Sequence, residues 1–144
     1  MKKINYNISL DKLEITYQAS QQVRDALATI KENKVINEIT IVRVEKPQHY
    51  QHEFLLFGKD YSVERGEYIR AIGVLFFGSL NENRQHIYIS YNNAALYDTY
   101  LLAARFYVEA ALGLEFYRVS KIDIALDLNR NVVTRFYRLY RDEA

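Results

Sequence analysis

The sequence has no cysteine, no tryptophan, a single proline and only five glycines among its 144 residues. The absence of cysteine excludes disulfides, thiolate zinc sites and cysteine nucleophiles, and it fits a reducing compartment, for which the cytoplasm is the default prediction. The shortage of proline and glycine, with no low-complexity run and no internal repeat, gives no sign of a linker. We therefore expect residues 1–144 to form a single domain.

The sequence also lacks a long hydrophobic run and an excess of charge. No eighteen apolar residues follow one another, and the basic start at residues 1–7 has no apolar signal segment after it, so we predict neither secretion nor a membrane partner. The net charge is only +1, whereas dedicated DNA-binding domains usually carry a clear basic excess. Basic residues are nevertheless concentrated late in the chain: Arg118, Lys121, Arg130, Arg135, Arg138 and Arg141.

The sequence is rich in hydrophobic and aromatic residues. Hydrophobic residues make up 49% of the chain, which is ample for a packed core, and thirteen of the residues are tyrosine and seven phenylalanine. Aromatic rings can stack on unpaired bases. The alternative for each tyrosine is a place at the edge of the core with its hydroxyl in water, and we expect this for most of them.

The hydrophobic periodicity predicts an α+β domain with a largely antiparallel β-sheet and helices packed on one face. Alternating or β-branched segments predict strands, and the strand at 68–77 is expected at the centre of the sheet because it is apolar on both faces. Ser20 is the expected N-cap of the first helix, and the helix at 98–112 is expected to be largely buried. The predicted strands are 12–19, 36–45, 50–57, 68–77, 86–92 and 118–128, and the predicted helices are 21–32, 98–112 and one after Asn129 or Asn131.

The segment 121–129 has the most informative pattern. A period of two places Asp123, Ala125 and Asp127 on one face of a strand and the aliphatic residues between them on the other, where we expect them to build the core. Two aspartates in an apolar strand are costly to bury without a partner. We therefore expect a metal ion, a basic side chain or a solvent-filled cleft beside them.

The same segment resembles the signature of the replication initiation factors of plasmids, phages and mobile elements. The likeness is carried by Asp123-x-Ala125-x-Asp127, by a strand at 87–92 and a helix at 101–104, and by the strand at 10–16. Members of that family nick one DNA strand at an origin and stay joined to it through a tyrosine. The family usually has arginine where this chain has Lys121, and lysine cannot form a bidentate fork with phosphate or carboxylate.

The resemblance implies a metal-dependent nicking site at Asp123 and Asp127, since Mg²⁺ or Mn²⁺ prefers carboxylate oxygens. Residues four apart on a strand are on the order of 13 Å apart, so one aspartate would bind the metal while the other holds a basic residue. The structural alternative is that Asp123 pairs with a neighbouring lysine or arginine and Asp127 caps the turn at 129–131. A metal site at His49 and His52 is disfavoured, because residues three apart on a strand point to opposite faces, and His86 has no tandem partner.

The family's tyrosine lies well downstream of the acidic strand, and the sequence does not choose among thirteen tyrosines, so the catalytic residue is unassigned. We expect the chain to be the amino-terminal part of a longer, endonuclease- and topoisomerase-like initiator and to be inactive alone. Lys121, Arg135, Arg138 and Arg141 are the predicted DNA contacts, through backbone phosphates. For the three arginines the alternative is an ordinary exposed helix face.

The leading functional prediction is therefore the amino-terminal domain of a replication initiation protein that binds origin DNA, single- or double-stranded, and contributes acidic residues to a nicking site. The alternative is a non-catalytic α+β module for nucleic-acid binding or protein interaction. An open sheet edge would also favour pairing with another chain, which makes a homodimer a further prediction.

Overall fold

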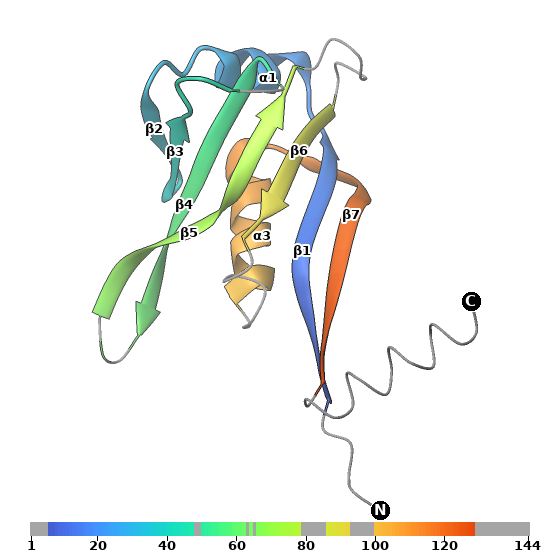
Figure 1. Ribbon diagram of the computed structural model, residues 1–144. Coiled ribbons are helices and arrows are strands. Elements are labelled where there is room, and N and C mark those ends of the chain that lie inside the picture. Colours follow the sequence, from blue (N-terminus) through green and yellow to red (C-terminus); the bar gives the residue numbers. More distant parts are fainter. Residues whose placement is uncertain are drawn as a thin grey trace, which may run out of the picture.

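Seven strands form one antiparallel sheet in the order β2-β3-β4-β5-β6-β1-β7 (Figure 1). The computed structural model describes residues 6–47, 50–62, 64, 66–78, 86–92 and 100–128. The elements are β1 (Tyr6–Gln18), α1 (Gln21–Ala28), β2 (Asn33–Ile36), β3 (Ile39–Arg43), β4 (His52–Ser62), β5 (Gly66–Phe77), β6 (His86–Tyr91), α3 (Tyr100–Leu112) and β7 (Glu115–Leu128). The predicted α+β class with a largely antiparallel sheet is confirmed, and β5 takes the central position that was expected for it.

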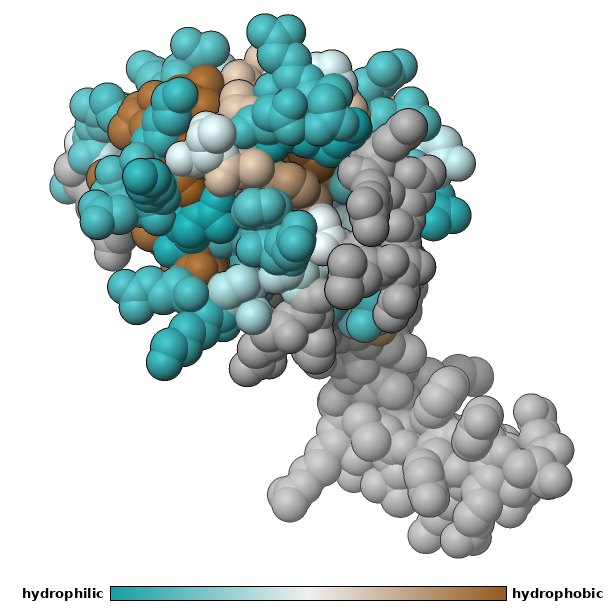
Figure 2. Space-filling model, turned by 90° about the horizontal axis from the view of Figure 1, so that it is seen from above, coloured by the Kyte–Doolittle hydropathy of each residue, from teal (hydrophilic) through white to brown (hydrophobic). Residues whose placement is uncertain are grey.

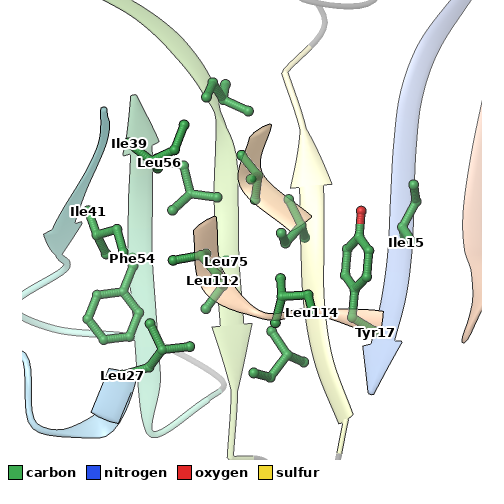
Figure 3. Packing of buried hydrophobic residues seen from close by; sticks show 14 of the residues in the cluster. Ile15, Tyr17, Leu27, Ile39, Ile41, Phe54, Leu56, Leu75, Leu112 and Leu114 are labelled. Carbon is green, nitrogen blue, oxygen red and sulfur yellow. The ribbon is translucent and has the colours of Figure 1, made fainter. Parts of the chain in front are cut away.

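Both helices contribute to one hydrophobic core on one side of the sheet (Figure 3). Leu27 of α1 and Val108 of α3 are buried there together with inward residues of the strands, such as Ile15, Phe54 and Ile89. We call this side of the sheet the helix face and the other side the open face. Seen from the end at which α1 lies, hydrophilic residues dominate the surface and hydrophobic ones form small patches between them (Figure 2).

Local sequence explains where α1 begins and ends. The Ser20 hydroxyl accepts a hydrogen bond from the Val23 amide at 3.2 Å, so the predicted N-cap is confirmed. The helix ends at Ala28, before the predicted residue 32, and Arg43 of β3 occupies its carboxyl end. The Arg43 guanidinium donates to the carbonyls of Ala28, at 2.9 Å, and Ile30, at 2.5 Å, which suits the negative end of a helix dipole.

The predicted strand at 36–45 is instead a hairpin of β2 and β3. Asn37 and Glu38 form its two-residue turn, and both have positive φ, 45° and 71°. Two-residue hairpin turns with this backbone normally have glycine at the second position. Because glutamate stands there, the sequence signal for the turn was weak, and the prediction of a single strand was wrong.

The pairing of β4 with β5 is longer than predicted, since it continues through the polar residues 58–67 from His52 opposite Phe77 to Ser62 opposite Gly66. Gly73 lies where this pairing is irregular and where β6 comes closest. A Cβ atom at Gly73 would lie 2.3 Å from the Ser90 carbonyl oxygen. Only glycine therefore allows β5 and β6 to pair at this point.

The position of β7 corrects a further expectation. The aliphatic side of this strand was predicted to build the core, but Ile122 and Ile124 are 54% and 65% exposed. The reason is topological, because β7 is the last strand of the sheet and β1 is its only neighbour among the described strands. The expected burial of α3 is also incomplete. Val108 is buried, whereas Phe106 and Tyr107 are both 64% exposed.

Candidate nucleic-acid interface on the open face

The open face is defined most clearly by β6. Ile87, Ile89 and Tyr91 point into the core, so His86 and Tyr88 lie on the opposite side, in accordance with the two-residue period of a strand. Thr16, directly opposite Tyr88 in the neighbouring β1, is fully buried on this side. The open face is thus covered by large side chains, although neither described helix contributes to it.

Five rings follow one another across this face and form what we call the aromatic row: Tyr50, Phe76, Tyr88, His86 and Tyr117. The centroids are 4.6 Å apart for Tyr50 and Phe76, and 5.5 Å apart for Phe76 and Tyr88. His86 continues the row with its centroid 6.3 Å from Tyr88 and 4.9 Å from Tyr117. These distances are typical of interacting aromatic pairs, so the rings support one another in place.

A β-bulge brings the last ring of the row to this face. Thr16 of β1 pairs with Arg118 of β7, whereas Tyr17 pairs with Phe116, so Tyr117 is an extra residue between them. Consecutive strand residues normally point to opposite faces, but here Tyr117 contacts His86 while Arg118 stands opposite Thr16. Both side chains are therefore on the open face, and the Arg118 guanidinium carbon lies 5.6 Å from the centre of the Tyr117 ring.

A groove of about 490 Å³ adjoins the other end of the row. Tyr50 and Phe76 belong both to the row and to the groove wall, and Lys12 and Lys46 place two cations in the same wall. Two carboxylates accompany them. The full lining is Lys12, Glu14, Val44, Lys46, Tyr50, Glu53, Val74, Phe76 and Ser90. The two cations and the two carboxylates of the wall balance each other, so its apolar ring faces suit a flat ligand.

Of the two aspartates that were predicted to bind a metal ion, only Asp123 has a described side chain. Asp123 is exposed and stands opposite Lys12 of β1 in the register, but the two described side chains form no ion pair. Asp127 pairs with Asn7 in the backbone ladder, and its side chain lies outside the described residues. Within the described ranges, no three His, Asp or Glu side chains are grouped so that they could hold a metal ion. Metal binding at these aspartates stays a prediction.

The predicted DNA contacts are described only in part. Lys121 is exposed and stands opposite Glu14 of β1 in the register. The hydroxyl of the neighbouring Ser120 donates to the Glu14 carbonyl at 3.1 Å and lies 3.2 Å from its carboxylate. The predicted contacts Arg135, Arg138 and Arg141 lie outside the described residues.

The two histidines whose rings are described, His52 and His86, contact aromatic side chains. His49 lies outside the described residues. The His52 ring stacks on Phe77 at 4.8 Å, and its Nδ1 lies 3.1 Å from an Arg43 nitrogen. Burial, and then the charge of Arg43, lower the pKa of His52. His86 is on the opposite side of the sheet, in the aromatic row.

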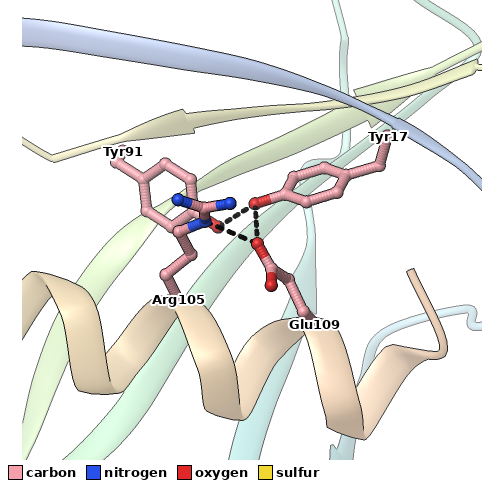
Figure 4. A network of polar contacts seen from close by, with 4 residues as sticks. All are labelled: Tyr17, Tyr91, Arg105 and Glu109. Atoms are coloured by element: carbon pink, nitrogen blue, oxygen red, sulfur yellow. Dashed lines mark hydrogen bonds and ion pairs between the residues drawn. The ribbon is translucent and has the colours of Figure 1, made fainter. Parts of the chain in front are cut away.

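A buried polar network holds α3 to the sheet (Figure 4). The hydroxyls of Tyr17 and Tyr91 are 2.6 Å apart, and the Tyr17 hydroxyl donates to a Glu109 carboxylate oxygen at 2.9 Å. Arg105 reaches the same oxygen at 2.6 Å. Burial raises the pKa of both tyrosines. Their phenols are therefore kept neutral, which is unsuitable for a nucleophile.

Sequence reasoning missed the aromatic row, although it noted the number of tyrosines. Period-two alternation in 86–92 could have placed His86 and Tyr88 on one face, but the bulge at Tyr117 has no sequence signal of its own.

Comparison of the chain with protein families, with curated proteins and with solved structures gave no match. No helix in the described part of the chain is long and apolar enough to cross a membrane.

Proposed function

We propose that this domain binds single-stranded nucleic acid on the open face of its sheet, as the origin-binding, amino-terminal part of a replication initiator in the cytoplasm. The observation that carries the binding proposal is the aromatic row with Arg118 at one end and the lysine-lined groove at the other. The initiator context is supported by the sequence resemblance around Asp123 and Asp127.

Stacking is the main source of affinity in this proposal. A base that stacks on an aromatic side chain contributes about 1 to 3 kcal/mol, and it does so without reading sequence, because every base has a flat face. Tyr117 is 47% exposed, so part of its surface is accessible. Arg118, beside the Tyr117 ring, would attract phosphates, whereas the charges of Lys12 and Lys46 in the groove wall are balanced by the carboxylates of the same wall.

The nicking role is proposed for the complete initiator. Asp123 would hold Mg²⁺ or Mn²⁺ while Asp127 holds a basic residue, because the two positions are too far apart on one strand to share an ion. Lys121 and the arginines at 135, 138 and 141 would contact phosphates, and the tyrosine that attacks DNA would come from another segment. The metal part is tested by thermal denaturation with Mg²⁺ or Mn²⁺. We expect stabilisation that disappears in Asp123→Asn, and an equal melting temperature with and without metal would refute it.

The binding proposal is tested by fluorescence anisotropy with a labelled single-stranded oligonucleotide. Tyr117→Ala should weaken binding by roughly tenfold or more, in line with the loss of one stacked base. Tyr107→Ala is the matched control, because Tyr107 is also exposed but lies on α3, away from the row. Equal losses in the two variants, or none in Tyr117→Ala, would refute a binding role for the row.

Charge gives a second readout of the same surface. Arg118→Ala should weaken binding and reduce the slope of log K against log salt concentration by about 1, since one cation fewer displaces counterions. If the slope is unchanged, Arg118 does not contact a phosphate. A duplex of the same sequence should bind less tightly than the single strand, because its bases are already stacked on one another.

A further inference from the structure

We propose that a second copy of this chain binds along the outer edge of β7, where two β7 strands would pair antiparallel about a two-fold axis. The surface is separate from the aromatic row. It consists of the outer backbone edge of residues 121–128 and of the exposed aliphatic side chains beside that edge.

The first argument is the exposure of apolar residues on this strand. Two of the large hydrophobic residues that are exposed in the described part of the chain lie in this stretch, Ile122 at 54% and Ile124 at 65%. Ile122 and Ile124 lie on the helix face of the strand, opposite the side of Asp123. Apolar side chains along an unpaired edge favour the addition of another strand.

The second argument is that β7 itself has no extra residue in this part of the edge. The other edge strand of the sheet, β2, has only four residues, and short edge strands resist pairing. β7 has fourteen residues, with extra residues at Tyr117 and Ser120 in its first half. From Lys121 to Leu128 it has no extra residue and no proline, and the one irregularity in its pairing there is an extra residue of β1, between the partners of Asp123 and Ile124. A partner strand could therefore pair along the outer backbone edge of 121–128 without meeting an extra residue of β7.

The third argument is self-complementarity, which selects a second copy as the occupant. A two-fold axis at Ile124 places Ile124 opposite Ile124 of the second copy and Ile122 opposite Leu126, so aliphatic positions meet aliphatic ones. The same register places the position of Lys121 opposite that of Asp127, on the other face. Two pairs of opposite charge and an aliphatic row thus arise from one symmetry operation, as isologous interfaces require.

The test is sedimentation equilibrium of the whole chain over a concentration series. We expect a monomer–dimer equilibrium, and Ile124→Lys should raise the dimer dissociation constant by about 100-fold or more, because two lysines would face each other at the axis. Ile69→Lys is the matched control, since Ile69 is 68% exposed on β5 and should leave the constant unchanged. A monomer at all concentrations, or equal effects of the two substitutions, overturns the proposal.

A charge exchange tests the register without changing the aliphatic row. Lys121→Asp alone should weaken the dimer, because it places like charges opposite each other. The double variant Lys121→Asp with Asp127→Lys should restore the dimer. Failure of the double variant to restore it overturns the two-fold register. If the apolar edge is instead covered by residues 129–144 or by another protein, the purified chain is monomeric, which also overturns the proposal. The nucleic-acid assay with Tyr117→Ala concerns the other surface, so each proposal can fail alone.

Discussion

The buried network of Tyr17, Tyr91, Glu109 and Arg105 gives the most direct test of how α3 is held to the sheet. Tyr17→Phe removes only the hydroxyl, because the ring keeps its volume in the core. The hydroxyl makes two hydrogen bonds, one with Tyr91 and one with the carboxylate of Glu109. The substitution leaves the Tyr91 hydroxyl without this partner in a buried place.

The expected cost follows from the kind of bond. A hydrogen bond to a charged group contributes about 1.5 to 3 kcal/mol, and a neutral one about 1 kcal/mol. Glu109 keeps its bond with Arg105, which limits the loss. We therefore expect Tyr17→Phe to lower the free energy of unfolding by about 2 to 3 kcal/mol. For a domain of this size that is a fall in melting temperature of about 8 to 12 °C.

The assay is urea denaturation followed by circular dichroism. Tyr107→Phe is the control, because Tyr107 lies on α3 but is exposed. Tyr91→Phe and the double variant complete a mutant cycle, which should give a coupling energy of about 1 kcal/mol between the two hydroxyls. If Tyr17→Phe is within about 0.5 kcal/mol of the wild type, the network does not hold the helix and the reasoning is refuted.

Two further predictions concern the sheet. Gly73→Ala should destabilise the domain by about 2 kcal/mol or more, because the new methyl would meet the Ser90 carbonyl and force β5 and β6 apart. Gly73 is not among the glycines with positive φ, so a loss of less than about 0.5 kcal/mol would contradict the steric cause. Gly66→Ala, with φ at 69° and no atom within 4 Å of its Cβ, shows what positive φ costs without a steric contact. The pKa of His52 is lowered in the folded protein, so the unfolded chain binds the proton more readily. We therefore expect the free energy of unfolding to be at its full value above about pH 6.5 and to fall as the pH decreases towards the folded-state pKa. Unfolding measured at several pH values should show a steeper loss in the wild type than in His52→Gln, and parallel plots of the free energy of unfolding against pH would argue against it.

The fold could be predicted from the sequence wherever periodicity was strong. The class, the antiparallel sheet, the Ser20 cap and the central place of β5 followed from alternation and from known capping preferences. The hairpin at Asn37 and Glu38 was missed because its second residue is not glycine. The exposure of Ile122 and Ile124 was missed because periodicity identifies an apolar side but not whether another element covers it.

The candidate site was less accessible to sequence reasoning. Asp123 was expected beside a metal or a basic residue, and the register places it opposite Lys12 without an ion pair between the two side chains, so neither alternative is decided. The aromatic row depends on strand order, since Phe76, Tyr88 and Tyr117 come from β5, β6 and β7. Strand order arises from long-range pairing, and neither composition nor local pattern reports it. His86 was weighed only as a metal ligand, whereas its ring links Tyr88 to Tyr117.

The place of β1 has a consequence for how the chain reaches its structure during synthesis. This first strand lies between β6 and β7, and its Tyr6 pairs with Leu128. Residues 6–18 must therefore wait for β6 and β7, which are synthesised after them, before they gain either neighbour. Such distant pairing slows folding, and until it occurs both sides of β1 are open to other chains. A ribosome-bound chain that stops before β6 already contains β2 to β5, which pair with one another in sequence order, whereas its β1 residues do not yet have a partner strand. The β2–β5 part of the sheet can therefore form first.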